Sequence, residues 1–126
     1  MTPTVPLPTE GELAILNVLW ATGPLTVREV HDRLDAAHPV TYTTVLKLLQ
    51  VMHQKGLVTR DEAERSHVYA AASPRERTEE RLIDHLSERA FGGSAARLVM
   101  RALSRTRASE EEKARIRALL DAEVDA

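Results

Sequence analysis

The chain has 126 residues, of which 43% are hydrophobic and 29% charged, and its formal net charge is −2. This size predicts one domain, or a small domain with an appendage, and the lack of cysteine excludes disulfides and thiolate metal sites. No signal peptide is visible, and no apolar run approaches the ~20 residues of a transmembrane helix. We therefore expect a cytoplasmic protein without membrane insertion.

Four capping boxes mark predicted helix starts. In this motif Ser or Thr is followed three residues later by Glu, and each side chain binds a backbone NH that the helix leaves free. The motif occurs at Thr9–Glu12, Thr26–Glu29, Ser73–Glu76 and Ser109–Glu112. Its spacing along the chain predicts a mainly helical protein.

Three helices are predicted in the first half of the chain, from the period of the apolar positions and from the Gly and Pro that end them. They cover Glu10–Thr22, Val27–Ala37 and a stretch that begins near Thr41 and ends at Gly56. Their predicted inward faces carry Leu13, Leu16, Leu19 and Trp20, then Val30 and Leu34, then Val45, Leu48, Leu49 and Met52. The opposite side of the third helix is polar.

Two short β-prone runs follow, LVTR and HVYAA, on either side of the polar DEAERS, and we predict a hairpin there. Further helices are predicted over Pro74–Phe91, Ser94–Arg105 and Glu110–Ala122. Their apolar stripes are narrow, and such small helices bury too little surface alone. A partner chain is expected to cover their apolar residues, which are Leu82, Leu86, Leu98, Val99, Leu103, Ile116, Leu119 and Leu120.

The longest stretch of the chain without an acidic residue lies in its first half. It runs from Ala36 to Arg60, although random placement of the 19 acids would put about four in those 25 positions. The stretch includes the third predicted helix and keeps the cations Lys47, Lys55 and Arg60. This pattern indicates an anionic partner.

The order of helix, helix, helix and hairpin within ~65 residues is that of a winged helix-turn-helix, whose third helix enters the major groove of DNA. Short Thr side chains at the start of that helix let the backbone approach phosphate, and the helix dipole favours an anion there. Lys47 and Gln50 can reach bases or phosphates, and Arg65 and His67 fall where a wing would touch DNA. A polar helix face taken alone is more often an ordinary solvated surface, so the order of the elements carries the interpretation.

The sequence has no recognisable catalytic or metal-binding pattern. His31 and Asp35 are four residues apart on a predicted helix, and we expect an exposed ion pair because two ligands do not make a metal site. No nucleophile elbow marks a catalytic triad, and no Gly-rich phosphate-binding motif is present. We expect no enzymatic activity, no cofactor and no metal.

These segments resemble the BlaI/MecI-type penicillinase repressors, a family that includes the copper-responsive CopY repressors. ELAILNVLW is similar to the family's first helix, LTVREVHDRL to its second, and VTYTTVLKLLQVMHQKGLVTR with VYAA to its recognition helix and wing. GSAARLVMRALSRTRASEEEKARIRALLD resembles its C-terminal dimerisation segment. The resemblance implies a homodimeric repressor of palindromic operators with TACA/TGTA half-sites. We therefore expect a DNA-binding domain over residues 1–73 and a helical dimerisation domain over residues 74–126.

Carried over by position, the resemblance places Thr43, Leu46 and Lys47 at base contacts and Thr44 at a phosphate contact. Leu46 departs from the polar residue common there and offers only apolar contact, for example to a thymine methyl. The predicted DNA-binding residues are Thr41, Tyr42, Thr43, Thr44, Leu46, Lys47, Gln50, Arg65 and His67.

The resemblance also implies that a membrane-bound sensor protease acts on the C-terminal region. Staphylococcal members carry an Asn-Phe cleavage bond where this chain has Arg101-Ala102. We predict that release, if proteolytic, occurs within Ser94–Arg107, with a ligand acting at the dimer interface as the alternative. The Cys-rich tail of the copper-responsive branch is absent, so direct copper sensing is not expected. A protein-interaction adaptor that uses a winged helix without DNA is the alternative function.

Overall fold

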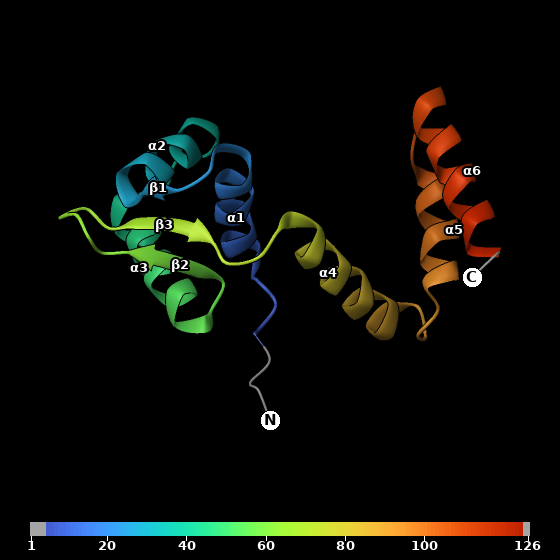
Figure 1. The fold of residues 1–126 in the computed structure, drawn as a ribbon, viewed down its shortest axis with the longest axis horizontal. Helices are drawn as coiled ribbons and strands as arrows, with labels where there is room; N and C mark the ends of the chain where they lie inside the picture. The colour runs from blue at the N-terminus through green and yellow to red at the C-terminus, as the bar shows by residue number, and fades with distance from the viewer. Residues whose placement is uncertain (1–4, 125–126) are drawn as a thin grey trace. The chain divides into compact units, whose positions relative to one another are not determined.

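The computed structural model describes residues 5–124, which are mainly helical with one small sheet, as the sequence predicts (Figure 1). The elements in chain order are α1 (Glu10–Thr22), β1 (Leu25–Thr26), α2 (Val27–Ala37), α3 (Tyr42–Lys55), β2 (Val58–Asp61), β3 (Val68–Ala71), α4 (Arg75–Ala90), α5 (Ala95–Arg105) and α6 (Glu110–Val124). Two compact units divide between Leu82 and Ile83, inside α4, whereas the sequence predicts a division after residue 73.

Three of the four predicted capping boxes form. In the boxes at Thr9, Thr26 and Ser109 the hydroxyl accepts from the backbone NH three residues on, and the Glu there accepts from the NH of the capping residue. At Ser73 the described residues show no such exchange. There α4 begins only at Arg75, and the carbonyl oxygen of Ser73 instead accepts the indole NH of Trp20 at 2.9 Å.

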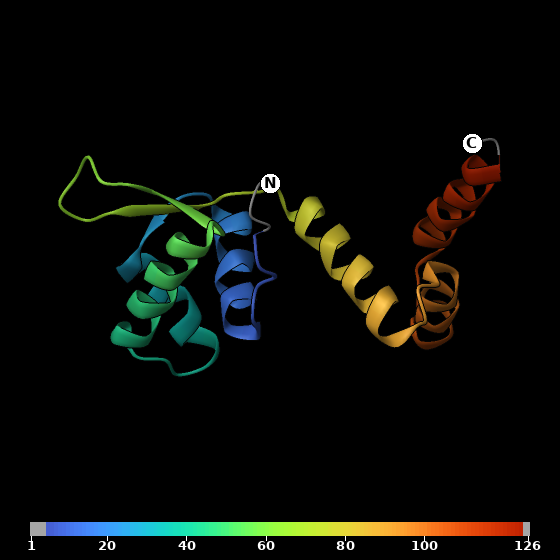
Figure 2. The ribbon, with the colours of Figure 1, turned by 90° about the horizontal axis from the view of Figure 1, so that it is seen from below.

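The sheet has the antiparallel order β1-β3-β2, with Leu25 opposite Tyr69 and Arg60 opposite Tyr69 on the other side. The predicted hairpin is therefore confirmed as β2 and β3. Their connecting loop, residues 62–67, projects away from the helices in both views (Figure 1, Figure 2). We call β2, β3 and this loop the wing. Strand β1 has only two residues, too few to show a strand pattern in the sequence.

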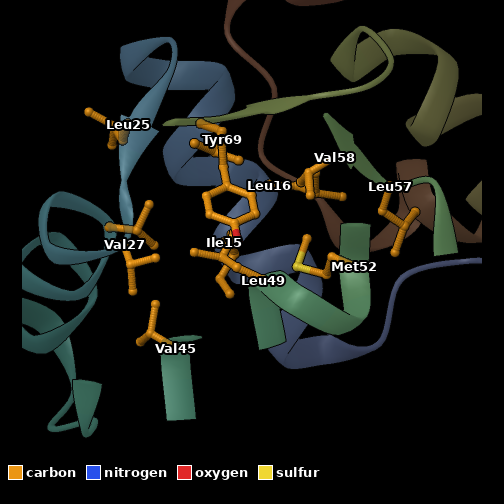
Figure 3. Close-up of a cluster of buried hydrophobic side chains, with 12 residues drawn as sticks. Ile15, Leu16, Leu25, Val27, Val45, Leu49, Met52, Leu57, Val58 and Tyr69 are labelled. Atoms are coloured by element: carbon orange, nitrogen blue, oxygen red, sulfur yellow. The ribbon is translucent and has the colours of Figure 1, made fainter. Parts of the chain in front are cut away.

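The core lies where α1, α2 and α3 pack against the sheet. Tyr69 from β3 is 1% exposed and points toward Ile15 and Leu49 (Figure 3). The stripe predicted for α3 is confirmed at Val45, Leu49 and Met52, each fully buried. In α1 the prediction omitted Ile15, which is buried completely, and included Leu13, which is only half-buried.

One charged pair joins the start of α1 to the end of α3. Glu12 is 1% exposed, and its Oε2 accepts from Lys55 Nζ at 2.8 Å. Burial raises the pKa of Glu12, but the hydrogen bonds from Lys55 and from the Thr9 amide outweigh it, so the net pKa lies below the usual value. The pair holds α3 at a defined position against α1.

The buried hydrophobic residues of the described chain all lie between Ile15 and Tyr69. In contrast, α5 has no buried residue. Large apolar side chains are exposed along α4, α5 and α6, namely Ile83, Leu86, Val99, Met100, Leu103, Leu119 and Leu120. Leu82, Leu98 and Ile116 are half-buried. These helices therefore carry apolar surface without a core of their own. No helix in residues 5–124 has the length and apolarity that a membrane crossing needs.

Candidate nucleic-acid interface

Helix α3 has one face in the core and one face in solvent. Thr41 caps its start, where the Thr41 hydroxyl accepts from the Thr44 amide at 3.2 Å. Gly56 ends it with φ 87°, a left-handed conformation that favours glycine. Because the apolar residues recur at the helical period, burying them leaves Thr43, Lys47 and Gln50 exposed.

A concave surface lies between the start of α2, the wing side of α3 and the wing. It has a volume of about 330 Å³ and is lined by Thr26, Val27, Arg28, Tyr42, Leu46, Gln50, Arg60, Arg65, Ser66, His67 and Tyr69. We call this surface the wing hollow. Because three arginines and several hydroxyl groups line it and no acid does, its chemistry suits an anion.

The wing hollow gathers five of the nine predicted DNA-binding residues: Tyr42, Leu46, Gln50, Arg65 and His67. Of the other four, Thr41 is the N-cap of α3, and Thr43, Thr44 and Lys47 are exposed outside the hollow's lining. Leu46 is half-buried and packs against the core. Contact between these residues and DNA remains a prediction.

Two arginines of the wing hollow were not among the predicted site residues. Arg28 lies in the first turn of α2, where the helix dipole disfavours a cation, and this unusual position is a sequence signal for a functional role. Its guanidinium carbon lies 5.0 Å from the centre of the Tyr42 ring. Arg60 was noted only as a cation of the acid-free stretch. It reaches the site because β2 lies beside α3 in the fold.

Arg60 is hydrogen-bonded by neighbours on the wing. Hydrogen bonding with the Tyr69 hydroxyl, and then with Glu62, raises the pKa of Arg60. Its Nη2 donates to Glu62 Oε2 at 3.2 Å, and the same carboxylate lies 3.9 Å from His67 Nε2. Its Nε is buried without a hydrogen-bond partner. Of the two hydrogen-bond partners, Tyr69 and Glu62, Glu62 is the exposed one, with 55% of its side chain accessible to solvent.

The turn between α2 and α3 is held by a histidine and an aspartate. His31 Nδ1 lies 3.0 Å from Asp32 Oδ1, and His31 Nε2 lies 2.8 Å from the carbonyl oxygen of Val40. The hydrogen bond to Asp32 is the main reason that the pKa of His31 is raised. Asp35 accepts from the Val40 amide at 3.0 Å. The predicted His31–Asp35 ion pair is wrong. The imidazole of His31 pairs with Asp32, and the carboxylate of Asp35 accepts a hydrogen bond from the backbone instead.

Within residues 5–124 no group of three or more His, Asp or Glu side chains is placed to hold a metal ion. The fold and the wing hollow instead define a winged helix-turn-helix protein with a cationic surface beside its third helix. The chain belongs to the penicillinase repressor family of transcriptional regulators, since the family's sequence pattern matches residues 8–122.

Comparison with individual relatives agrees with this assignment. The transcriptional regulator BlaI of Mycobacterium tuberculosis is 35% identical over 114 residues, which cover 89% of this chain and 82% of that protein. The solution structure of the DNA-binding domain of the repressor BlaI superposes with a TM-score of 0.53 at 20% identity, over 59% of this chain and 90% of that domain. The solution structure of the monomeric form of Bacillus licheniformis BlaI in complex with the blaP half-operator superposes with a TM-score of 0.51 at 20% identity, over 58% of this chain and 89% of that chain. These structural likenesses support the winged-helix fold.

Proposed function

We propose that the protein is a dimeric repressor that binds palindromic operator DNA with TACA/TGTA half-sites through α3 and the wing. The observation that carries the proposal is the exposed polar face of α3 beside a hollow lined by three arginines. The solved complex of B. licheniformis BlaI contains a half-operator, and membership of the same family supports DNA binding by this chain. The protein would act by occupying DNA, without catalysis.

Within this function the residues of α3 divide by position. Thr43, Lys47 and Gln50 are exposed and reach base edges, whereas Thr41 and Thr44 lie at the helix start, where backbone amides and short hydroxyls suit phosphate. Leu46 is half-buried and gives at most an apolar contact at the edge of the wing hollow.

The dimer forms through residues 74–126, with residues 1–73 as the DNA-binding domain. Two half-sites that lie one or two turns of DNA apart require two recognition helices at a fixed spacing, and a dimer interface provides that spacing. The exposed apolar residues of α4, α5 and α6 can form this dimer interface, because contact with a second protomer would remove their apolar area from water.

Release from DNA follows an upstream signal. If the signal is proteolytic, the cut falls within Ser94–Arg107, a range that holds α5 and the exposed Arg101-Ala102 bond. The cut would detach α6 and reduce both dimer and operator affinity. Mass spectrometry of the protein from induced cells tests this proposal. An intact chain that has left its promoter would exclude cleavage as the trigger.

A gel shift tests the function as a whole. The full chain should bind a duplex with two TACA/TGTA half-sites more tightly than a scrambled duplex of the same length, and salt should weaken both complexes. Equal and salt-independent failure to bind either duplex would favour the protein-interaction adaptor. A linker of one extra half-turn between the half-sites is the matched control, because it turns the second half-site away from the dimer.

A further inference from the structure

The wing hollow combines three arginines with several neutral hydrogen-bond donors. Arg28 enters it from α2, Arg60 from β2 and Arg65 from the wing loop. None of its lining residues is acidic, although acids outnumber Lys and Arg in the whole chain by 19 to 17. The hollow lies beside the polar face of α3, so a DNA strand whose bases faced α3 would bring its backbone to this surface.

Arg28 contacts an aromatic ring from α3. The guanidinium lies over the Tyr42 ring, 5.0 Å from its centre. A cation–π contact of this kind needs no hydrogen-bond acceptor for the five N–H groups of the guanidinium. Among the described residues no ion pair or side-chain hydrogen bond occupies them. Arg28 is therefore held beside the Tyr42 ring, and its charge has no ion-pair partner among the described residues.

At the wing side of the hollow, a carboxylate already occupies an anion position. Glu62 places one oxygen 3.2 Å from Arg60 Nη2 and the other 3.9 Å from His67 Nε2. A phosphate offers the same arrangement, because two of its oxygens can face two different donors. The Glu62 side chain is 55% exposed, so it can leave without a change in the core.

We propose that the wing hollow binds one backbone phosphate of operator DNA between Arg28 and Arg60, and that Glu62 holds the Arg60 side of this site as an internal competitor until DNA arrives. The proposal rests on the proposed DNA binding and adds a phosphate contact from α2, through Arg28. An exposed ion pair such as Arg60–Glu62 is weak, so a polyanion exchanges with it readily. Arg60 is thereby paired with Glu62 in the free protein and becomes available to a phosphate when DNA binds.

The first test measures the phosphate contact. Affinity of the full chain for the TACA/TGTA duplex and for a scrambled duplex is followed by fluorescence anisotropy over a range of KCl concentrations. Arg28→Ala should weaken both complexes on the order of tenfold and lower the slope of log affinity against log salt by about one. Arg33→Ala, an exposed arginine of the same helix outside the hollow, is the matched control.

The second test measures the competitor, and it predicts a gain of affinity. Glu62→Gln should bind DNA about two- to fivefold more tightly than Glu64→Gln, because both remove one wing charge but only Glu62 pairs with Arg60. An Arg28→Ala protein that behaves like Arg33→Ala, or a Glu62→Gln protein no tighter than Glu64→Gln, would overturn the proposal and leave the repressor function standing. If the unaltered protein binds neither duplex, the proposed function itself fails.

Discussion

Replacing Lys55 by Met tests whether the buried pair between α1 and α3 stabilises the DNA-binding unit. Met keeps most of the side-chain length and removes the charge, so Glu12 stays in a site where it is 1% exposed but loses its cation. Removing one partner of a buried pair usually costs about 3–5 kcal/mol. Lys55 is itself 31% exposed, and Glu12 keeps its hydrogen bond from the Thr9 amide. We therefore expect the free energy of unfolding to fall by about 2–3 kcal/mol in this variant.

The assay is urea unfolding followed through Trp20, the single tryptophan, which bonds to Ser73 in the N-terminal unit. The midpoint should fall by about 2 M, given an m-value of about 1–1.5 kcal/mol/M for a unit of this size. Lys47→Met, an exposed lysine on the same helix, is the control and should change the free energy of unfolding by less than about 0.5 kcal/mol.

The stabilisation that the Glu12–Lys55 pair contributes should depend on pH in a defined direction. In the unaltered protein the pKa of Glu12 is lowered, so its stabilisation is present above the unfolded value of 4.5 and is lost as pH falls through the folded pKa. In Lys55→Met the two contributions of Lys55 that lower the pKa of Glu12 are lost, so less stabilisation remains to be lost on acidification. The difference between the two proteins should therefore shrink as pH falls from 7 to about 4. A difference that is small at pH 7, or that does not change with pH, would refute this account of the pair.

Three further predictions concern the DNA face, the dimer and the turn. Lys47→Ala should weaken operator binding by about 1–3 kcal/mol with loss of sequence preference if Lys47 reads a base, and unchanged affinity in anisotropy would exclude that role. A fragment ending at Ala72 should stay folded, become monomeric and lose most operator affinity, which sedimentation and gel shift measure together; a dimeric fragment would contradict the assignment. His31 has a raised pKa, so its stabilisation is full below the unfolded value of 6.5 and is lost as pH rises through the folded pKa. Unfolding of His31→Asn at pH 6 and pH 8 should show less of this pH dependence than the unaltered protein.

Most of the helices could be predicted because their signals are local. A capping box needs only residues three apart, and this is why Thr9 and Thr26 identify the starts of α1 and α2. The 3.6-residue period places Val45, Leu49 and Met52 on one face of α3 from the sequence alone. The acid-free stretch likewise identified the helix whose polar face is exposed, because composition is a property of the chain.

Local signals failed where a second segment decides the outcome. The pattern at Ser73 matches a capping box, yet its carbonyl is engaged by Trp20, more than fifty residues earlier, and α4 begins at Arg75. The two residues of β1 form a strand only because β3 lies beside them. His31 pairs with Asp32 instead of Asp35, because the returning chain places the Val40 amide against Asp35.

The sequence by itself determined the helices, the hairpin, the polar face of α3 and, through its motifs, the resemblance to the repressor family. Only the tertiary structure decided the wing hollow, since Arg28, Tyr42 and Arg60 come from three elements that no periodicity connects. It also decided that Leu46 is half-buried at the hollow's edge. The physical reason is range: capping and amphipathic period act over a few residues, whereas a charged site forms where packing of the core brings distant side chains to one surface.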